Sequence, residues 1–340
     1  MTDFISSVRK RPGMYVGFSD RRGICVMLEY LLEFVQVLFR RGECFGAEFR
    51  LGDSIEFCCD FVPFDGFESC FENRFDFRAG DPAINNVFCV VNGLSSELEA
   101  EIRYGENGRL LRFKEGEPVG AGSDIPGGQK CGLRVIFRPD RRFFGESRVR
   151  TAEFSSRVRE FTACNSGVKI TVCEGEYSEL FCCENGLIDY TGYIFNNILP
   201  NDAAFIPISV GDGVVTVEAV LCLPYLCGDC PDYERVISFA NGRRTNQGGV
   251  HVEGFLEGVW NAFRELGCGY KECSSITAGV VNLEMKNVPY GGSTREYVLS
   301  DDEFTLHDKI AGLVGSSLTE YFRENRQAAV LAADIIRQYT

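Results

Sequence analysis

The chain has 340 residues, of which 45% are hydrophobic and 25% charged, and its formal net charge is −14. These values are typical of a globular protein that is large enough for two hydrophobic cores. The acidic balance predicts weak direct binding to DNA, because proteins that coat a duplex usually carry a basic face.

Membrane and secretory signals are missing from the sequence. Every run of 18 residues contains charges, so we expect no transmembrane helix and no association with a membrane. The N-terminus lacks the apolar core of a secretory signal. We therefore expect a cytoplasmic protein whose 16 cysteines remain reduced and mostly fill apolar positions.

The first half of the chain alternates predicted helices and strands. A short helix at 3–9 should end before Pro12, because proline disfavours helix in the residue before it. Residues 62–82 are rich in Phe, Asp and Gly and are expected to be irregular, and 116–131 should form a glycine-rich loop. The sequence further predicts helices at 23–42, 84–95, 151–163 and 186–198, and strands at 46–51, 54–61, 97–104, 109–115, 132–138, 168–173 and 178–183.

The composition changes near residues 199–202 (LPND), where we expect a domain boundary. The predicted domains are residues 1–198 and 199–340, and both mix helices with strands, which indicates an α+β fold class. In the second domain the patterns predict strands at 204–210, 214–223, 234–240 and 276–285, a helix at 249–266 and two helices within 303–338.

The long helix carries the most informative pattern of the chain. Residues 24–41 read ICVMLEYLLEFVQVLFRR, and the polar positions Glu29, Glu33, Gln36 and Arg40 step by four, three and four. That spacing places them on one narrow stripe of an otherwise apolar helix.

One cysteine pair has the spacing of a metal or redox site. Cys227 and Cys230 enclose Gly-Asp, with Cys222 nearby, but no second CxxC follows, and His251 and His307 are the only histidines. A tetrahedral metal site would need ligands that the sequence does not supply. Ordinary loop thiols are the favoured interpretation, and a metal site at this pair is the weaker one.

Several segments, in the same order along the chain, resemble the ATPase half of the B subunits of DNA gyrase and topoisomerase IV. The resemblance covers about residues 5 to 325. It implies a GHKL (Bergerat-type) α/β sandwich followed by a ribosomal-S5-domain-2-like transducer domain, without the TOPRIM domain of the family. The matching segments are residues 8–17 (VRKRPGMYVG), 89–95 (CVVNGLS), 132–140 (GLRVIFRPD), 165–168 (NSGV), 247–255 (QGGVHVEGF) and 286–295.

The resemblance also implies where the family's catalytic groups should lie. Aligned from Gly23, the family's glutamate base falls on Tyr30 and its magnesium-binding asparagine on Phe34, while Glu33 keeps a carboxylate. A phenol with a pKa of roughly 10 is a poor base at neutral pH, and phenylalanine cannot bind a hard cation. A shift of one residue would place Glu29 at the base position, although it would not restore the asparagine.

The other nucleotide motifs lose polar or glycine character as well. Asp60 stands for the aspartate that holds adenine, but Phe61 and Phe64 would fill the volume of the base. Residues 82–87 (PAINNV) replace the glycines of the phosphate-binding lid, and Leu133 replaces the strand threonine. In the second domain, the glutamine and the lysine that reach the nucleotide correspond to Ser293 and Arg295.

These substitutions favour a gyrase-B-like pseudo-ATPase without catalytic residues or cofactor, acting as a binding or regulatory protein linked to DNA topology. Residual nucleotide-binding candidates are Glu33, Asp60 and Arg295. Expected partners are subunits of gyrase or topoisomerase IV, or a second copy of the chain. The alternative is a divergent ATPase domain of a type II topoisomerase that uses ATP and Mg²⁺, and a weaker one is an acidic decoy that competes with DNA.

Overall fold

The computed structural model describes residues 4–64, 66–72, 82–127, 132–195, 204–223, 235–267, 277–291, 295–300 and 306–339. It forms two compact units, Met1–Cys182 and Cys183–Thr340. The predicted boundary at 199–202 lies outside the described residues. Helix α7 (Leu187–Phe195), which we expected at the end of the first domain, contacts strands of the second unit.

The first unit is built on one mixed sheet, which has nine strands in the described residues. Its order is β5-β4-β3-β7-β2-β1-β8-β9, and β6 also pairs with β4. The β1 strand lies antiparallel to β2 and parallel to β8, with Gly46 opposite Lys169. The strands are β1 (Gly46–Leu51), β2 (Ile55–Cys59), β3 (Ser95–Tyr104), β4 (Asn107–Lys114), β5 (Glu117–Pro118), β6 (Ser123–Pro126), β7 (Gly132–Pro139), β8 (Lys169–Glu174) and β9 (Tyr177–Phe181).

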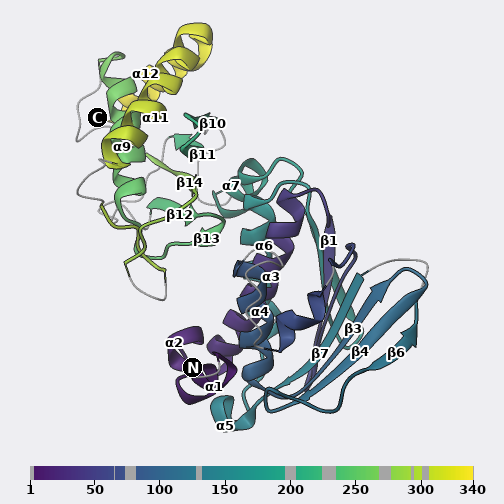
Figure 1. The fold of residues 1–340 in the computed structure, drawn as a ribbon. Coiled ribbons are helices and arrows are strands. Elements are labelled where there is room, and N and C mark those ends of the chain that lie inside the picture. Colours follow the sequence, from purple (N-terminus) through teal and green to yellow (C-terminus); the bar gives the residue numbers. More distant parts are fainter. Residues whose placement is uncertain are drawn as a thin grey trace. The chain divides into compact units, whose positions relative to one another are not determined.

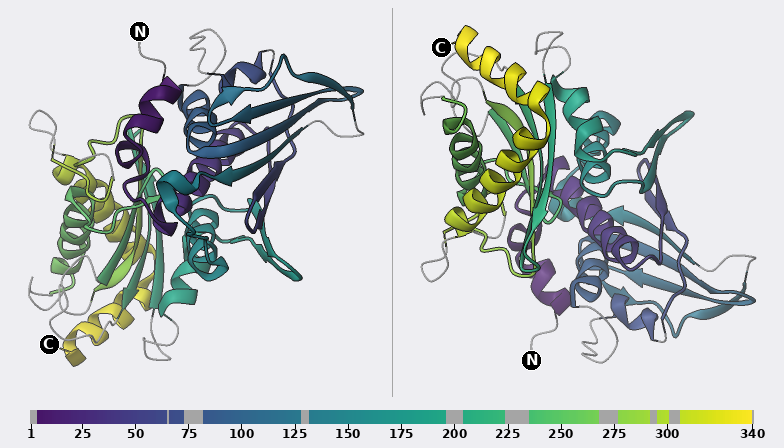
Figure 2. Two further views of the ribbon diagram at one scale, coloured as in Figure 1. Left: turned by 90° about the horizontal axis from the view of Figure 1, so that it is seen from below. Right: turned by 90° about the horizontal axis from the view of Figure 1, so that it is seen from above.

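The longer helices of this unit gather on one face of the sheet (Figures 1 and 2). Helices α3, α4 and α6 contact strands β1, β3 and β8 respectively. The helices are α1 (Phe4–Lys10), α2 (Gly13–Val16), α3 (Arg21–Arg40), α4 (Pro82–Gly93), α5 (Arg141–Phe144), α6 (Thr151–Cys164) and the 3₁₀ turn η1 (Phe67–Phe71). None of the helices in the described part of the chain is long and apolar enough to cross a membrane.

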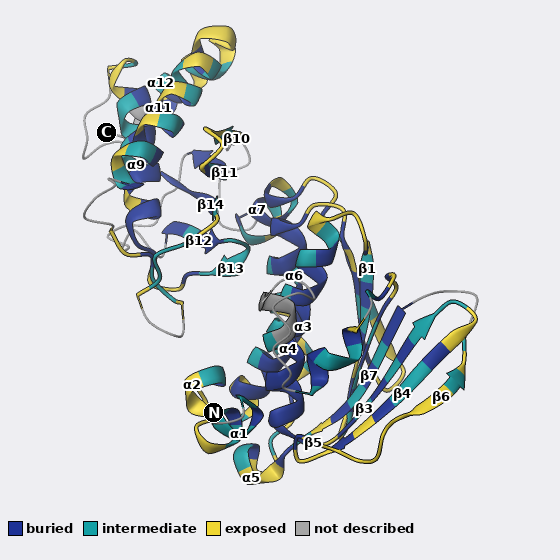
Figure 3. Cartoon of the chain, viewed as in Figure 1, coloured by how far each residue is buried: buried dark blue, intermediate teal, exposed yellow. Residues whose placement is uncertain are grey.

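Alternation along the strands separates a core face from a charged face. Phe49, Phe57 and Val135 are fully buried under the helices, and buried residues appear dark blue in Figure 3. On the opposite face, Arg134 bridges two strands: its Nε lies 2.6 Å from Glu56 and its Nη1 lies 2.7 Å from Glu101. The glutamates of this face are thus interleaved with arginines.

The expected glycine-rich loop at 116–131 is wrong in part, because β5 and β6 occupy portions of it. Glu117 and Pro118 pair with the end of β4, and Ser123–Pro126 pair with its beginning. These pairings depend on backbone register with β4, which glycine content alone does not report. The short helices α2 and α5 were not predicted either, since four residues are too few to show a periodicity.

The second unit is a three-layer arrangement around a sheet that has five strands in the described residues. The sheet order is β10-β11-β14-β12-β13. Ser238 faces α9 through Thr245 and His251, whereas the next residue, Phe239, meets Tyr190 of α7 on the opposite face, with ring centroids 5.9 Å apart. The elements are β10 (Ala204–Gly211), β11 (Val215–Leu223), β12 (Val236–Ala240), β13 (Arg243–Arg244), β14 (Ala278–Met285), α9 (Val250–Arg264), α11 (Leu306–Glu324) and α12 (Arg326–Tyr339).

Gly249 shows why the start of α9 needs a glycine. Its φ is +128°, a conformation that other L-residues rarely adopt. A Cβ built there would lie 2.3 Å from the backbone oxygen of Val298. The close approach lets Val298 form backbone hydrogen bonds with Gly248 and Val250.

Candidate functional site

Helix α3 is the element on which the predicted catalytic positions lie. Its N-cap is Asp20, whose side chain accepts a hydrogen bond of 2.8 Å from the backbone N–H of Arg22. Its apolar face includes Leu28, Leu31 and Val35, all fully buried. The helix therefore presents a continuous hydrophobic surface to the sheet, as its periodicity predicts.

Phe34 lies in the middle of a group of phenylalanine rings. Its ring centroid is 4.9 Å from that of Phe88 and 5.5 Å from that of Phe61, both in edge-to-face geometry. The rings of Phe57 and Phe67 follow at 6.3 and 6.1 Å. We name the whole group the phenylalanine cluster; its members are between 0% and 4% exposed and are Phe34, Phe57, Phe61, Phe67, Phe71 and Phe88.

The cluster supplies no group that could orient water or bind a cation. Aromatic rings at these distances attract one another through dispersion and quadrupole interactions, and each buries a large apolar area. Hard cations require oxygen ligands, and an attacking water requires a base. The contribution of the cluster is therefore hydrophobic packing rather than catalysis.

Tyr30 stands one turn before Phe34 on α3 and is partly buried against the same core. Its hydroxyl donates a hydrogen bond of 3.0 Å to the backbone oxygen of Tyr15, which lies in α2. This bond fixes α2 against α3. It also uses the phenol as a donor, which is the opposite of what a general base does.

The remaining predicted residues of the first unit divide between core and surface. Phe61 and Leu133 are buried, and Phe64 packs at the edge of the core, with its ring centroid 5.2 Å from that of Phe67. Asp60 is exposed directly after β2, and Glu33 is partly exposed. The structure thus brings the predicted apolar residues into one core, while the two carboxylates lie toward the surface.

Residues 82–87, which replace the phosphate-binding lid of the family, form the start of a helix. Helix α4 starts at Pro82, a residue suited to the first helical position. Further along α4, Phe88 enters the phenylalanine cluster, and Asn92 donates hydrogen bonds of 2.9 and 3.2 Å to the backbone oxygens of Phe71 and Gly116. These contacts tie α4 to η1 and to the turn after β4.

Glu29 is the carboxylate that a shifted alignment would place at the base position. Its Oε1 lies 3.3 Å from Nε of Arg157 on α6. The same guanidinium forms a second ion pair, of 3.0 Å, with Glu160. This geometry gives Glu29 a role in joining α3 to α6.

The described residues offer no group of three or more His, Cys, Asp or Glu side chains that could hold a metal ion. Cys227, Cys230 and Ser293 lie outside the described residues. Arg295 belongs to the second unit, where its guanidinium lies 5.6 Å from the ring centroid of Tyr290.

Comparison with known proteins adds the evolutionary context. No family model matches the chain. It is 25% identical over 366 residues to the B subunit of DNA gyrase from Synechocystis sp., covering 94% of this chain and 33% of that protein. It is 27% identical over 267 residues to the B subunit of DNA topoisomerase 4 from Escherichia coli, covering 72% of this chain and 40% of that protein.

Two solved structures match almost the whole chain. The B subunit of DNA gyrase from Myxococcus xanthus superposes with a TM-score of 0.80 at 21% identity, covering 97% of this chain and 99% of that one. The 43K ATPase domain of Thermus thermophilus gyrase B, in complex with an aminocoumarin, also gives 0.80, at 19% identity, covering 99% and 95%. This chain has the gyrase B ATPase fold.

The gyrase B resemblance and the GHKL-type α+β fold class are therefore confirmed. The chain spans between 33% and 55% of the length of the curated gyrase B and topoisomerase IV B sequences that it matches. Within this gyrase B fold, sequence reasoning identified two members of the phenylalanine cluster, Phe34 and Phe61, and the neighbouring Phe64. It missed Phe57, Phe67, Phe71 and Phe88, for which the signals were the total of 28 phenylalanines and the Phe-rich stretch at 62–82.

Proposed function

We propose that this chain is a gyrase-B-like pseudo-ATPase, a non-hydrolysing binding or regulatory protein linked to DNA topology. The observation that carries the proposal is the burial of Phe34, which is 1% exposed at the position that the resemblance assigns to the magnesium ligand. Its partners would be subunits of gyrase or topoisomerase IV, or a second copy of itself, and neither ATP nor Mg²⁺ would be its cofactor.

The surrounding contacts support the same proposal. Phe61, which the resemblance assigns to the adenine site, packs edge-to-face on Phe67 at 5.3 Å beside Phe34. Tyr30, at the position of the base, donates a hydrogen bond from its hydroxyl to the backbone oxygen of Tyr15. Opening this core for a nucleotide would expose several aromatic side chains, each of which contributes about 1.5–3 kcal/mol when buried.

Nucleotide binding gives the direct test. We expect calorimetric titration with a non-hydrolysable ATP analogue and Mg²⁺ to give no binding heat at micromolar concentrations, and we expect no turnover of Mg·ATP. The 43K domain of Thermus thermophilus gyrase B, run in parallel, would serve as the reference. Micromolar binding that depends on Mg²⁺ would contradict the proposal and favour a divergent ATPase; loss of turnover in Glu29→Ala or Glu33→Ala would then locate the relocated base.

The partner is tested separately from nucleotide binding. Light scattering after gel filtration would detect self-association, and mixing with purified gyrase and topoisomerase IV subunits would detect a heteromeric complex. The acidic-decoy alternative requires a face with an excess of negative charge. The charged face of the first sheet does not provide one, because its glutamates pair with arginines; the pairs are Arg112 with Glu99, and Arg134 with Glu56 and Glu101. If this chain competed with DNA for binding to gyrase, and the competition were lost at high salt, the result would support the decoy alternative.

A further inference from the structure

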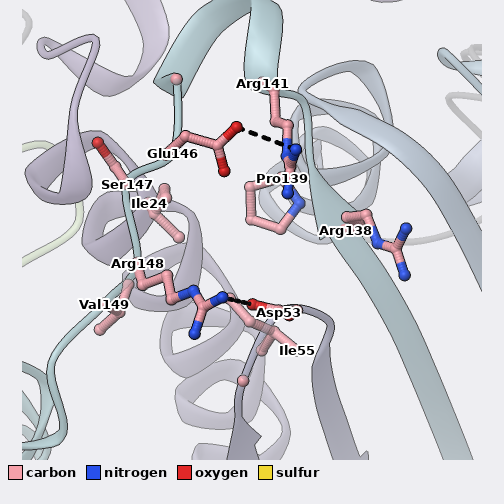
Figure 4. Close-up of a pocket in the computed structure, with 12 residues that line it drawn as sticks. Ile24, Asp53, Ile55, Arg138, Pro139, Arg141, Glu146, Ser147, Arg148 and Val149 are labelled. Carbon is pink, nitrogen blue, oxygen red and sulfur yellow. Dashed lines mark ion pairs between the residues drawn. The ribbon is translucent and has the colours of Figure 1, made fainter.

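A cavity in the first unit lies at the N-terminal end of α3, away from the middle turns that carry Tyr30 and Phe34. It has a volume of about 120 Å³ and lies between the first turn of α3, the β1–β2 turn, the end of β7 and the segment that joins α5 to α6 (Figure 4). Ile24 lines it, ten residues before Phe34 on α3, which corresponds to about 15 Å along the helix axis. This cavity is therefore separate from the phenylalanine cluster.

Arginines dominate the charge of this cavity. Arg138, Arg141 and Arg148 line it, and an adjoining hollow that shares Ser147 and Arg148 adds Arg21, Arg22 and Arg150. The carboxylates that line the two hollows are Asp20, Asp53 and Glu146, so the formal charge of the lining is +3. In a chain with a net charge of −14, such a local excess of positive charge attracts anions.

Two of the carboxylates form exposed ion pairs across the cavity (Figure 4). Arg148 lies 2.5 Å from Asp53, and Arg141 lies 2.9 Å from Glu146; all four side chains are more than 60% exposed. Exposed pairs of this kind contribute little to stability. An anionic ligand could therefore exchange with Asp53 or Glu146 at small cost.

Two further arginines carry no ion pair in the described structure. The guanidinium of Arg138 has a hydrogen bond only to the hydroxyl of Ser54, at 3.5 Å. Arg150 precedes the first turn of α6 and is exposed, and no carboxylate of the described chain pairs with it. These guanidinium groups remain available to a ligand.

We propose that the two adjoining hollows, the arginine cleft, bind a small ligand that carries two or more phosphate groups. A guanidinium donates paired hydrogen bonds that match phosphate oxygens, and it keeps its charge at any physiological pH. None of the described residues that line the cleft is aromatic, so it would hold the phosphates without stacking on a base. A short condensed phosphate and a small bisphosphorylated metabolite share this chemistry.

Calorimetric titration of the full chain with phosphate, pyrophosphate and tripolyphosphate tests the proposal. We expect affinity to rise with the number of phosphate groups and to fall as salt is raised. The double variant Arg138→Gln/Arg150→Gln should weaken tripolyphosphate binding about tenfold or more, since it removes two charged donors. Arg50→Gln, an exposed arginine of β1 paired with Glu48, is the matched control and should bind as the parent does.

A gain of affinity provides a test that misfolding cannot imitate. Asp53→Asn removes the carboxylate that competes for Arg148, so tripolyphosphate should bind several-fold more tightly. The proposal fails if neither the double variant nor Asp53→Asn changes the affinity, or if Arg50→Gln weakens it equally. It also fails if a single-stranded DNA oligomer binds the cleft while tripolyphosphate does not. Comparing tripolyphosphate with a sugar bisphosphate would distinguish the two sources of ligand.

Discussion

Replacing Phe34 by alanine is expected to lower the free energy of unfolding of the first unit by about 3–5 kcal/mol, the range for truncating a buried phenylalanine. The ring is 1% exposed and contacts four other rings of the phenylalanine cluster. Truncation removes these contacts and leaves a cavity, which a densely packed core refills only in part. A polar residue at this site would add the cost of an unsatisfied group.

The free energy of unfolding must be measured with a probe that lies in the first unit. The only tryptophan, Trp260, lies on α9 in the second unit, so its fluorescence follows a different part of the chain. Hydrogen exchange of peptides from α3 and β2 in rising urea would give the stability where the change is made. Phe34→Leu should cost clearly less than Phe34→Ala, and Phe45→Ala, at a side chain that is 65% exposed, should cost almost nothing. A loss below about 1 kcal/mol for Phe34→Ala would mean that the cluster is not a rigid core.

Replacing Asp140 by asparagine should cost about 2 kcal/mol at pH 7. The carboxylate is 4% exposed and lies 2.8 Å from the guanidinium groups of both Arg9 and Arg142. It also accepts a hydrogen bond of 3.0 Å from the backbone N–H of Arg142, which caps α5. Arg9 donates in turn to the backbone oxygen of Gly93 at 2.6 Å, so Asp140 joins α1, α4 and α5.

The pH dependence of this loss follows from the pKa of Asp140. Burial raises that pKa, but the hydrogen bonds from Arg142 and Arg9 outweigh it and lower the pKa to about 2 from an ordinary value of 3.8. Because the folded pKa is the lower one, the carboxylate stabilises the fold fully above about pH 4. This contribution disappears as the pH falls from about 4 to 2.

Urea denaturation at a series of pH values checks both statements. The gap between the parent and Asp140→Asn should be constant from about pH 7 to about pH 5 and should shrink below about pH 4. Asp124→Asn is the control, because Asp124 is 87% exposed in its ion pair with Arg109 and should shift stability by less than about 0.5 kcal/mol. A gap that persists unchanged at about pH 3 would show that the loss arises from the amide rather than from the missing charge.

The sequence allowed most of the secondary structure to be predicted, because hydrophobic periodicity is a local property. Helix α3 was expected at 23–42 and runs over Arg21–Arg40. The same periodicity predicted a polar stripe, yet Gln36 is only 9% exposed and donates a hydrogen bond of 3.1 Å to Asn165. That partner is 129 residues away and belongs to the turn after α6, so no local pattern could reveal it.

The candidate site was predictable only where the resemblance supplied an alignment. It placed Phe34, Phe61 and Phe64 at nucleotide positions, and these residues do lie together. Phe67 and Phe71 come from η1, within the stretch that was expected to be irregular, and Phe88 comes from a helix that the sequence predicted without assigning that residue a role. Their convergence in one cluster is a tertiary property, which a local pattern does not report.

The parallel pairing of β1 with β8 has a consequence for folding during synthesis on the ribosome. Gly46 cannot meet Lys169 until the ribosome has delivered more than a hundred further residues, so the part of the sheet next to its β9 edge closes late. Until then β1 has an unpaired edge exposed to solvent, and exposed strand edges can pair with other chains and aggregate. Nascent chains stalled before Lys169 should therefore engage chaperones more strongly than chains released after Phe181.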